Sequence, residues 1–401
     1  MHSPTPSPRD TRIDVIRALA LITIFVNHVP GNPLEPLTSK NFGFSDAAEA
    51  FVLISGVSAA LAYGTKFSPE HRLATTLKMW RRAGVLYIAQ LGTTMATLGI
   101  FAFFALHFAA PHLLENINIG PVIEDTAASL FGIVTFGHQL GYNNILSMYA
   151  VVLLLVPGFL LIGRLYGLAA MVAGSGAVWL AAGVLRVGPP NYPNDGGWFL
   201  NPLSWQFLFV IGIAATLHVR RGGKLPANPW LVGCAAAYLL LSLVWVKVPL
   251  WGIDTSLGLP TVLTGFDKTY LSAPRLLHVL AAAYLVAVLP WINRRARLSP
   301  DNALAIMGRY ALPVFVTGTI LSMAAQAWRM VHVPDIVGDL AIVTGGILLQ
   351  FALAFYIEWY RRVTRGDWRP AATSGISARN DARSAQPAGL QRAAAPARGA
   401  V

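Results

Sequence analysis

Long apolar stretches follow one another along most of the chain and are separated by short polar segments. A helix needs about 20 mostly apolar residues to cross the hydrocarbon core of a bilayer. The stretches that approach or exceed this length are 13–30, 46–64, 80–107, 144–163, 166–185, 198–218, 229–248, 273–292, 303–328 and 338–360. The pattern therefore predicts an all-α polytopic membrane protein with about ten transmembrane helices.

The same pattern divides the chain into a polar segment at 1–12, a membrane domain at 13–365 and a tail at 371–401. The tail is rich in Ala, Arg, Gly, Ser and Pro and lacks hydrophobic periodicity, which predicts disorder. No small-residue cleavage site follows the first apolar stretch, where the chain reads NHVPGNPLEP. We therefore expect a retained first helix and not a signal peptide.

Composition and charge agree with a membrane protein and predict its orientation. The chain has 55% hydrophobic and 12% charged residues, whereas soluble domains carry about 25% charged residues. A cytoplasmic amino terminus would put 24 of the 30 Lys and Arg residues on the cytoplasmic side. The positive-inside rule thus predicts that both termini are cytoplasmic. The net charge of +12 is then mostly loop charge, and it does not call for a nucleic-acid partner.

The first predicted helix carries three polar residues, Asp14, Arg17 and His28. Arg17 and His28 are eleven residues apart, so they share one helix face at depths that differ by about 16 Å. Asp14 is three residues before Arg17 and can pair with it. Each has an ordinary interpretation, Arg17 as a membrane anchor and His28 as a water-facing helix end. Their alignment favours a shared polar cavity.

The second predicted helix begins with the sequence FSDAAEAFVLISG, which places Asp46 and Glu49 in its first turn. Acidic residues there are typical of helix capping. They also lie at the same end of the bundle as His28, and a carboxylate beside a histidine can orient a general base. The pattern leaves open whether either residue supports His28 or only caps the helix.

More polar residues are expected near that level. Taken singly, each is typical of an interfacial or interhelical hydrogen bond. They are Asn144, Gln206, Arg275 and His278. We find no Ser/His/Asp triad, metal-ligand cluster or P-loop, and we expect neither a metal nor a tightly bound cofactor. The single cysteine, Cys234, cannot form a disulfide within the chain.

Four stretches resemble the OpgC-type family, which succinylates osmoregulated periplasmic glucans. They are RIDVIRALAL, NHVPGNPLEPLT, NFGFSDAAEAFVLISG and NPLSWQFLFVIG. That family belongs to the membrane acyltransferase-3 group, whose mark is an Arg, ten residues and a His, here Arg17 and His28. The resemblance covers roughly 10–365. It implies ten helices, cytoplasmic termini, a multi-pass location in the bacterial inner membrane and an acyl-CoA donor.

The resemblance implies that His28 is catalytic and that succinyl-CoA is the co-substrate. We expect His28 to activate a hydroxyl of a periplasmic glucan, with Asp46 or Glu49 as its support and Asn144 or helix-end amides at the oxyanion. We expect the phosphates of the donor to meet basic residues at the inner mouth. These residues are Arg17, Arg81, Arg82 and Arg309. Direct transfer and an acyl-histidine intermediate both remain open.

Two other function classes fit the same pattern. Charged residues within a membrane also occur in transporters, here of a glycan or an anionic metabolite. No paired halves with broken helices are visible, which speaks against that interpretation. A non-catalytic partner of a glucan synthase would need no chemistry at His28.

Overall fold

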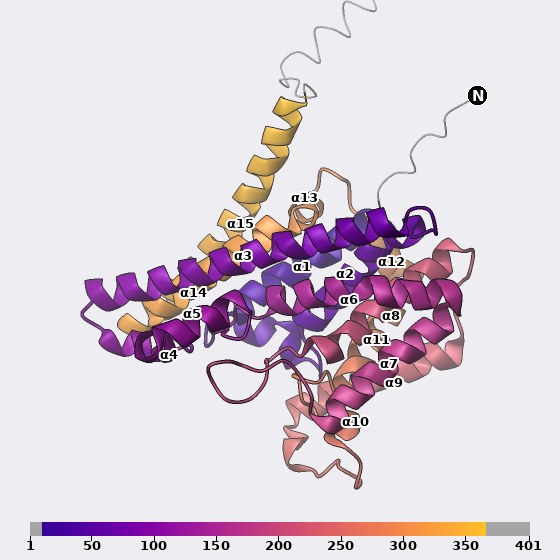
Figure 1. Ribbon diagram of the computed structural model, residues 1–401, viewed down its shortest axis with the longest axis horizontal. Helices are drawn as coiled ribbons and strands as arrows, with labels where there is room; N and C mark the ends of the chain where they lie inside the picture. The colour runs from indigo at the N-terminus through magenta and orange to yellow at the C-terminus, as the bar shows by residue number, and fades with distance from the viewer. Residues whose placement is uncertain (1–9, 366–401) are drawn as a thin grey trace, which may run out of the picture. The chain divides into compact units, whose positions relative to one another are not determined.

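The computed structural model describes residues 10–365, and Figure 1 shows that this part of the chain is built from helices. Within that range the extended pairing is limited to one bridge between Pro190 and Gly197. The predicted all-α class is confirmed. The predicted tail at 371–401, and residues 1–9 of the predicted amino-terminal segment, lie outside the described residues.

Most helices coincide with the predicted stretches, but the predicted span 80–107 begins earlier, at Arg72, and the predicted spans 273–292 and 303–328 are each divided between two helices. The long helices are α1 (Thr11–Asn27), α2 (Ala47–Ala62), α3 (Arg72–His107), α6 (Ile145–Leu165), α7 (Leu168–Leu185), α8 (Pro202–Arg220), α9 (Pro229–Lys247), α11 (Ala273–Val288), α14 (Ala311–Val331) and α15 (Ile336–Thr364). The shorter helices are α4 (Gly120–Glu124), α5 (Thr126–Val134), α10 (Thr261–Thr264), α12 (Pro290–Ala296) and α13 (Ala303–Arg309). Short 3-10 turns cover Glu35–Leu37, Ser39–Asn41, Gly64–Lys66, Pro111–Glu115 and Leu250–Gly252.

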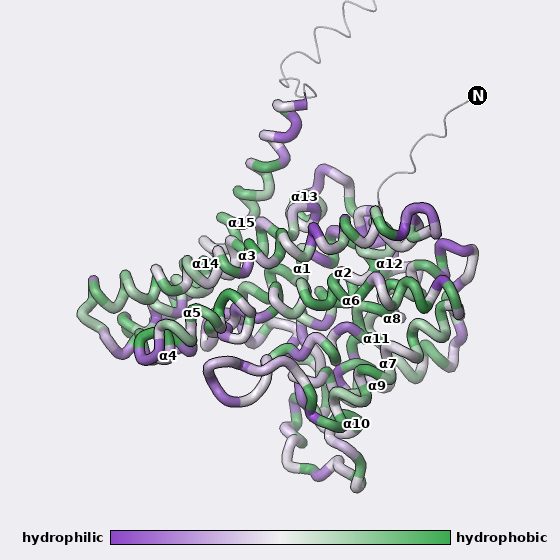
Figure 2. The backbone as a smooth tube through the Cα atoms, viewed as in Figure 1, coloured by the Kyte–Doolittle hydropathy of each residue, from purple (hydrophilic) through white to green (hydrophobic). Residues whose placement is uncertain are grey.

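In the described range, eight helices are long and apolar enough to span a membrane, and a ninth span results if α11 and α12 count as one. Those two helices meet at a bend of 86°. Helix α1 has 17 residues, at the short end of the range that crosses a bilayer. Figure 2 shows hydrophobic residues along most of the helices and hydrophilic residues in the connections. The polytopic membrane protein is confirmed, with eight or nine spans by this measure against the ten we predicted.

Helices α2 and α8 pack closely because each has a glycine that faces the backbone of the other helix. A Cβ atom on Gly56 would lie 2.1 Å from the carbonyl oxygen of Phe209, and one on Gly212 would lie 2.4 Å from that of Leu53. Just after the end of α2, a Cβ atom on Gly64 would lie 3.0 Å from the Leu217 side chain, near the end of α8. At the other end, Lys268 links the two helix starts, because its side chain donates to Asp46 before α2 and its carbonyl oxygen accepts from Trp205 in the first turn of α8. The two helices therefore start together and end together, which means that α2 and α8 run parallel.

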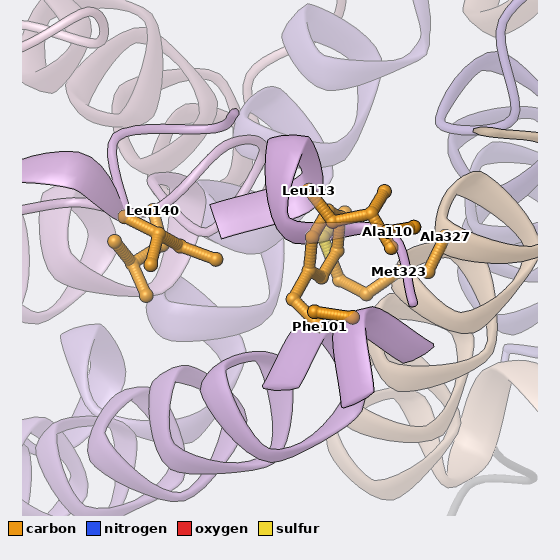
Figure 3. Close-up of a cluster of buried hydrophobic side chains, with 8 residues drawn as sticks. Phe101, Ala110, Leu113, Leu140, Met323 and Ala327 are labelled. Atoms are coloured by element: carbon orange, nitrogen blue, oxygen red, sulfur yellow. The ribbon is translucent and has the colours of Figure 1, made fainter. Parts of the chain in front are cut away.

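The segment between α3 and α6 is held against the bundle by its own apolar cluster. Phe101 of α3 and Met323 of α14 pack with Leu113 and Leu140 of the segment, and Figure 3 shows these side chains. All four side chains are fully buried. The segment is therefore a fixed part of the fold, and this matters because it carries Tyr142.

His138 in the same segment is buried, with 2% of its surface exposed. Its Nε2 donates to the carbonyl oxygen of Asn118 at 2.8 Å, while Nδ1 is buried without a hydrogen-bond partner among the described residues. Burial lowers the pKa of His138, because a second ring proton would have no acceptor.

The chain divides into two units, Met1–Phe355 and Tyr356–Val401. The described part of the second unit is the last stretch of α15, where Glu358 and Arg362 form an ion pair at 2.8 Å. All the candidate site residues lie in the first unit.

Candidate functional site

Arg17 is held inside the bundle by contacts to three helices. Its guanidinium donates to Asp14 at 3.3 Å, to the carbonyl oxygen of Gly308 at 3.2 Å and to the hydroxyl of Ser58. Asp14 is 2% exposed. The pairing of Asp14 with Arg17 is therefore present as predicted, and the bonds from Arg17 to Ser58 and Gly308 join α1 to α2 and α13.

His28 directly follows the last residue of α1 and stacks on an aromatic ring from the segment before α6. The ring centroids of His28 and Tyr142 are 4.5 Å apart with planes 12° from parallel. Gln326 of α14 donates to the backbone carbonyl of His28 at 2.6 Å. The ring is half-buried, and no described residue forms a hydrogen bond with its nitrogens. His28 is thus fixed by its backbone and one ring face, and its nitrogens remain available.

Asp46 and Glu49 form a capping box at the start of α2. The Asp46 side chain accepts from the amide of Ala48 at 2.8 Å, and Glu49 accepts from the amide of Asp46 at 2.9 Å. Two peptide donors that the helix leaves unpaired are satisfied in this way. The capping function that the sequence offered as the ordinary interpretation is present for both residues.

The same two carboxylates also pair with cationic side chains that lie far away in the sequence. Lys268 donates to Asp46 at 2.5 Å, and Arg275 of α11 bonds to Glu49 at 2.6 and 2.8 Å. A longer contact of 3.6 Å joins Arg275 to Asp46. Glu49 is fully buried. These four residues form what we call the charge cluster, in which two positive and two negative groups compensate each other.

The charge cluster lies near His28 without a hydrogen bond to it in the described structure. Lys268, Asp46 and Lys40 are the charged groups that act electrostatically on the His28 ring. The support of His28 by Asp46 or Glu49 therefore stays a prediction, and the contacts present are those to Lys268 and Arg275. Sequence reasoning assigned no role to Lys268 or Tyr142.

His278 lies one turn after Arg275 and fixes the segment that leads into α2. Its Nδ1 is 2.6 Å from the hydroxyl of Ser45 and accepts from the Ser45 amide at 3.3 Å. A Cβ atom on Gly43 would lie 2.0 Å from the His278 ring, so this close approach requires glycine. Arg275 and His278 together attach α11 to the start of α2.

Asn144 and Gln206 have contacts of a structural kind. Gln206 is fully buried and exchanges hydrogen bonds with Ser175, which ties α8 to α7. Asn144 precedes α6, is 8% exposed and makes no side-chain cap bond. Neither side chain is bonded to His28 or to the charge cluster within the described residues.

The residues predicted to bind the donor lie toward the ends of α2 and α8 that are far from the charge cluster. Arg81 is exposed and Arg82 half-buried within α3, which begins at Arg72, earlier than the predicted span. Arg309 ends α13 and donates to the carbonyl oxygen of Pro300 at 2.8 Å. Tyr149 of α6, which the sequence did not single out, interacts electrostatically with both Arg17 and Arg82. Polar groups therefore continue between these two arginines.

The described residues contain no group of three or more His, Cys, Asp or Glu side chains that could hold a metal ion. Comparison with known families gives a match over most of the chain: the family model described as OpgC protein matches residues 9–362. Searches of the curated proteins and of the solved structures gave no match. The resemblance noted in the sequence is confirmed by the family match.

Proposed function

Because the chain belongs to the OpgC protein family, we propose that it is a membrane-bound O-acyltransferase that transfers succinyl from succinyl-CoA to hydroxyls of periplasmic glucans. Membership of the family supports a role in the modification of osmoregulated periplasmic glucans. The observation that carries the catalytic proposal is the state of His28. Its ring is held by Tyr142 and its nitrogens have no hydrogen-bond partner in the described structure.

In the proposed reaction, a nitrogen of the neutral His28 ring takes the proton from a glucan hydroxyl. The oxygen forms a bond to the thioester carbonyl carbon of the donor, and the carbon–sulfur bond then breaks. The leaving thiolate receives the proton from His28, so that ester, free thiol and neutral histidine result. In the two-step alternative, the acyl group passes first to His28 and then to the glucan.

The charge cluster would influence this reaction electrostatically, through its effect on the protonation of His28. A negative charge at Asp46 favours the protonated His28 that forms during transfer, whereas Lys268 opposes it. Because Lys268 and Asp46 form an ion pair, their opposite effects on His28 partly cancel. Asp46 and Glu49 are then positioning residues, since each contacts a cation and not the reacting ring.

The donor is proposed to enter from the opposite end of the bundle. Arg17, Arg81, Arg82 and Arg309 supply guanidinium groups there, and guanidinium pairs well with phosphate oxygens. The series from Arg82 through Tyr149 to Arg17 supports a polar path into the bundle. A donor from one side of the membrane and an acceptor from the other would meet near His28.

Replacement of His28 with Ala tests the proposal. Loss of a general base lowers rates by about 10²–10⁴-fold, so glucan from cells that depend on this variant should elute as neutral material on anion exchange. A matched control is His332→Ala, since His332 also follows a helix end and stacks on an aromatic ring, that of Trp328, at 3.6 Å. The control should keep the glucan anionic. Normal amounts of anionic glucan with His28→Ala would refute the assignment.

A further inference from the structure

A second polar site lies at the end of the bundle where α2, α6 and α8 finish and α7 begins. A cavity of about 240 Å³ opens there, and its lining includes Arg164, Arg220 and Arg221. The parallel course of α2 and α8 puts this cavity at the far end of α2 from the charge cluster. Sixteen residues of helix separate the two ends by about 24 Å.

The three arginines of this cavity have no counter-ion in the described structure. No ion pair or hydrogen bond joins Arg164, Arg220 or Arg221 to another described side chain, and all three are exposed. Glu70 acts electrostatically on Arg164 from a fully exposed position. The positive charge of the cavity is therefore largely uncompensated, unlike that of the charge cluster at the other end.

The cations alone have an ordinary explanation, because Arg164 and Arg220 lie in the last turns of α6 and α8, where the helix dipole favours positive charge. That explanation does not account for the donors beside them. Thr65 and Ser68 also line the cavity, although the Ser68 hydroxyl already bonds to the His71 ring at 3.0 Å. Helix α7 begins at the lining residue Leu168 without a side-chain cap, which leaves peptide N–H groups there for an acceptor.

Gly167 keeps this helix start open. Its φ of +92° lies in the region that favours glycine, and no atom lies within 4 Å of the position of a Cβ there. Guanidinium groups, hydroxyls and helix-start amides are the donors with which proteins bind phosphate oxygens. The lining also includes the apolar side chains of Phe67 and Met171, which would exclude water from part of such a group.

We propose that this cavity, lined by Arg164, Arg220 and Arg221, binds a phosphate group. Two sources have this chemistry, the nucleotide end of a coenzyme A thioester and the headgroup of an anionic phospholipid. The first source rests on the proposed acyltransferase function and would add three arginines to those expected to meet the donor. The second source is independent of that function.

The test compares the full chain with the variant R164Q/R220Q/R221Q and a charge-matched control. The control replaces Lys78, Arg294 and Arg365, which are exposed and lie outside the cavity. In the first arm, coenzyme A is titrated into protein in phosphatidylcholine nanodiscs, and we expect binding at least tenfold weaker for the cavity variant alone. In the second arm, native mass spectrometry measures phosphatidylglycerol that remains bound after purification.

Weaker coenzyme A binding with unchanged lipid identifies the nucleotide phosphate as the ligand. Loss of bound phosphatidylglycerol with unchanged coenzyme A binding identifies the lipid phosphate. If the cavity variant matches the control in both arms, the proposal is refuted. Since both arms measure binding, this outcome is separate from failure of the acyltransferase proposal, which is read from the charge of the glucan in cells with His28→Ala.

Discussion

Neutralising Glu49 should destabilise the protein more than neutralising Asp46, although the two residues share one capping box. In Glu49→Gln the amide oxygen can still accept from the Asp46 peptide, so the cap is retained. What changes is the ion pair to Arg275, whose two contacts to Glu49 are 2.6 and 2.8 Å. After the substitution, the nearest carboxylate oxygen to Arg275 is that of Asp46, at 3.6 Å.

The expected magnitudes follow from burial. The side chains of Arg275 and Glu49 are 13% and 0% exposed, and breaking a buried pair from one side costs about 3–5 kcal/mol. The Lys268 side chain is 27% exposed, so water screens its pair with Asp46, and we expect Asp46→Asn to cost about 1 kcal/mol. Asparagine also caps helices about as well as aspartate does.

Thermal unfolding of the purified protein in detergent, followed by tryptophan fluorescence, measures the order of stability. The midpoint should fall in the order wild type, Asp46→Asn, Glu49→Gln. Adding Arg275→Gln to Glu49→Gln should raise the midpoint again, because it removes the buried charge left without its partner. A double variant that unfolds below Glu49→Gln, or a Glu49→Gln midpoint equal to wild type, would refute this reasoning.

Three further predictions concern donor binding, orientation and pH. Replacing Arg81 and Arg82 with Gln should raise the donor KM at least tenfold and leave the acceptor KM unchanged, because charge-assisted phosphate bonds contribute about 1.5–3 kcal/mol each. In a chain whose native cysteine is replaced, Ser39→Cys should react with an impermeant maleimide from the periplasm and Lys224→Cys should not; the reverse would invert the topology. His138 binds a proton less well folded than unfolded, so stability should fall as the pH drops through about 6.5 toward its lowered folded pKa. His138→Gln should flatten this loss between pH 7.5 and 5.5 in unfolding midpoints, and an identical pH dependence would contradict the assignment.

Local sequence predicted those features that depend on neighbours within one helix. Apolar length gave the helices, the three-residue spacing gave Asp14 with Arg17, and Asp46 with Glu49 gave the capping box. In both pairs the partner is three residues away, so helix geometry alone brings the groups together. The first helix forms as expected, yet its 17 residues put it at the lower limit of a span.

The rest of the site depends on contacts that no local pattern contains. Lys268 is 222 residues from Asp46 in sequence, and Arg275 is 226 residues from Glu49. The sequence placed Arg275 among the polar residues expected near the level of His28, and it suggested no role for Lys268. The sequence suggested that Asp46 and Glu49 either cap the helix or support His28. In the structure they also pair with Lys268 and Arg275, and no local pattern could have indicated these two partners.

The contact between α2 and α8 bears on the choice between a transferase and a transporter. Gly56 and Gly212 put the two backbones in contact midway along the helices, so the helices are expected to move as one body. The charge cluster is at one end of this pair and the arginine-lined cavity at the other. A transporter must change the accessibility of a central site by moving such units against each other. A transferase needs only a fixed path along which an extended donor reaches from one end toward the other. The close glycine contact between α2 and α8 therefore fits the proposed transferase better than a transporter in which these two helices move against each other.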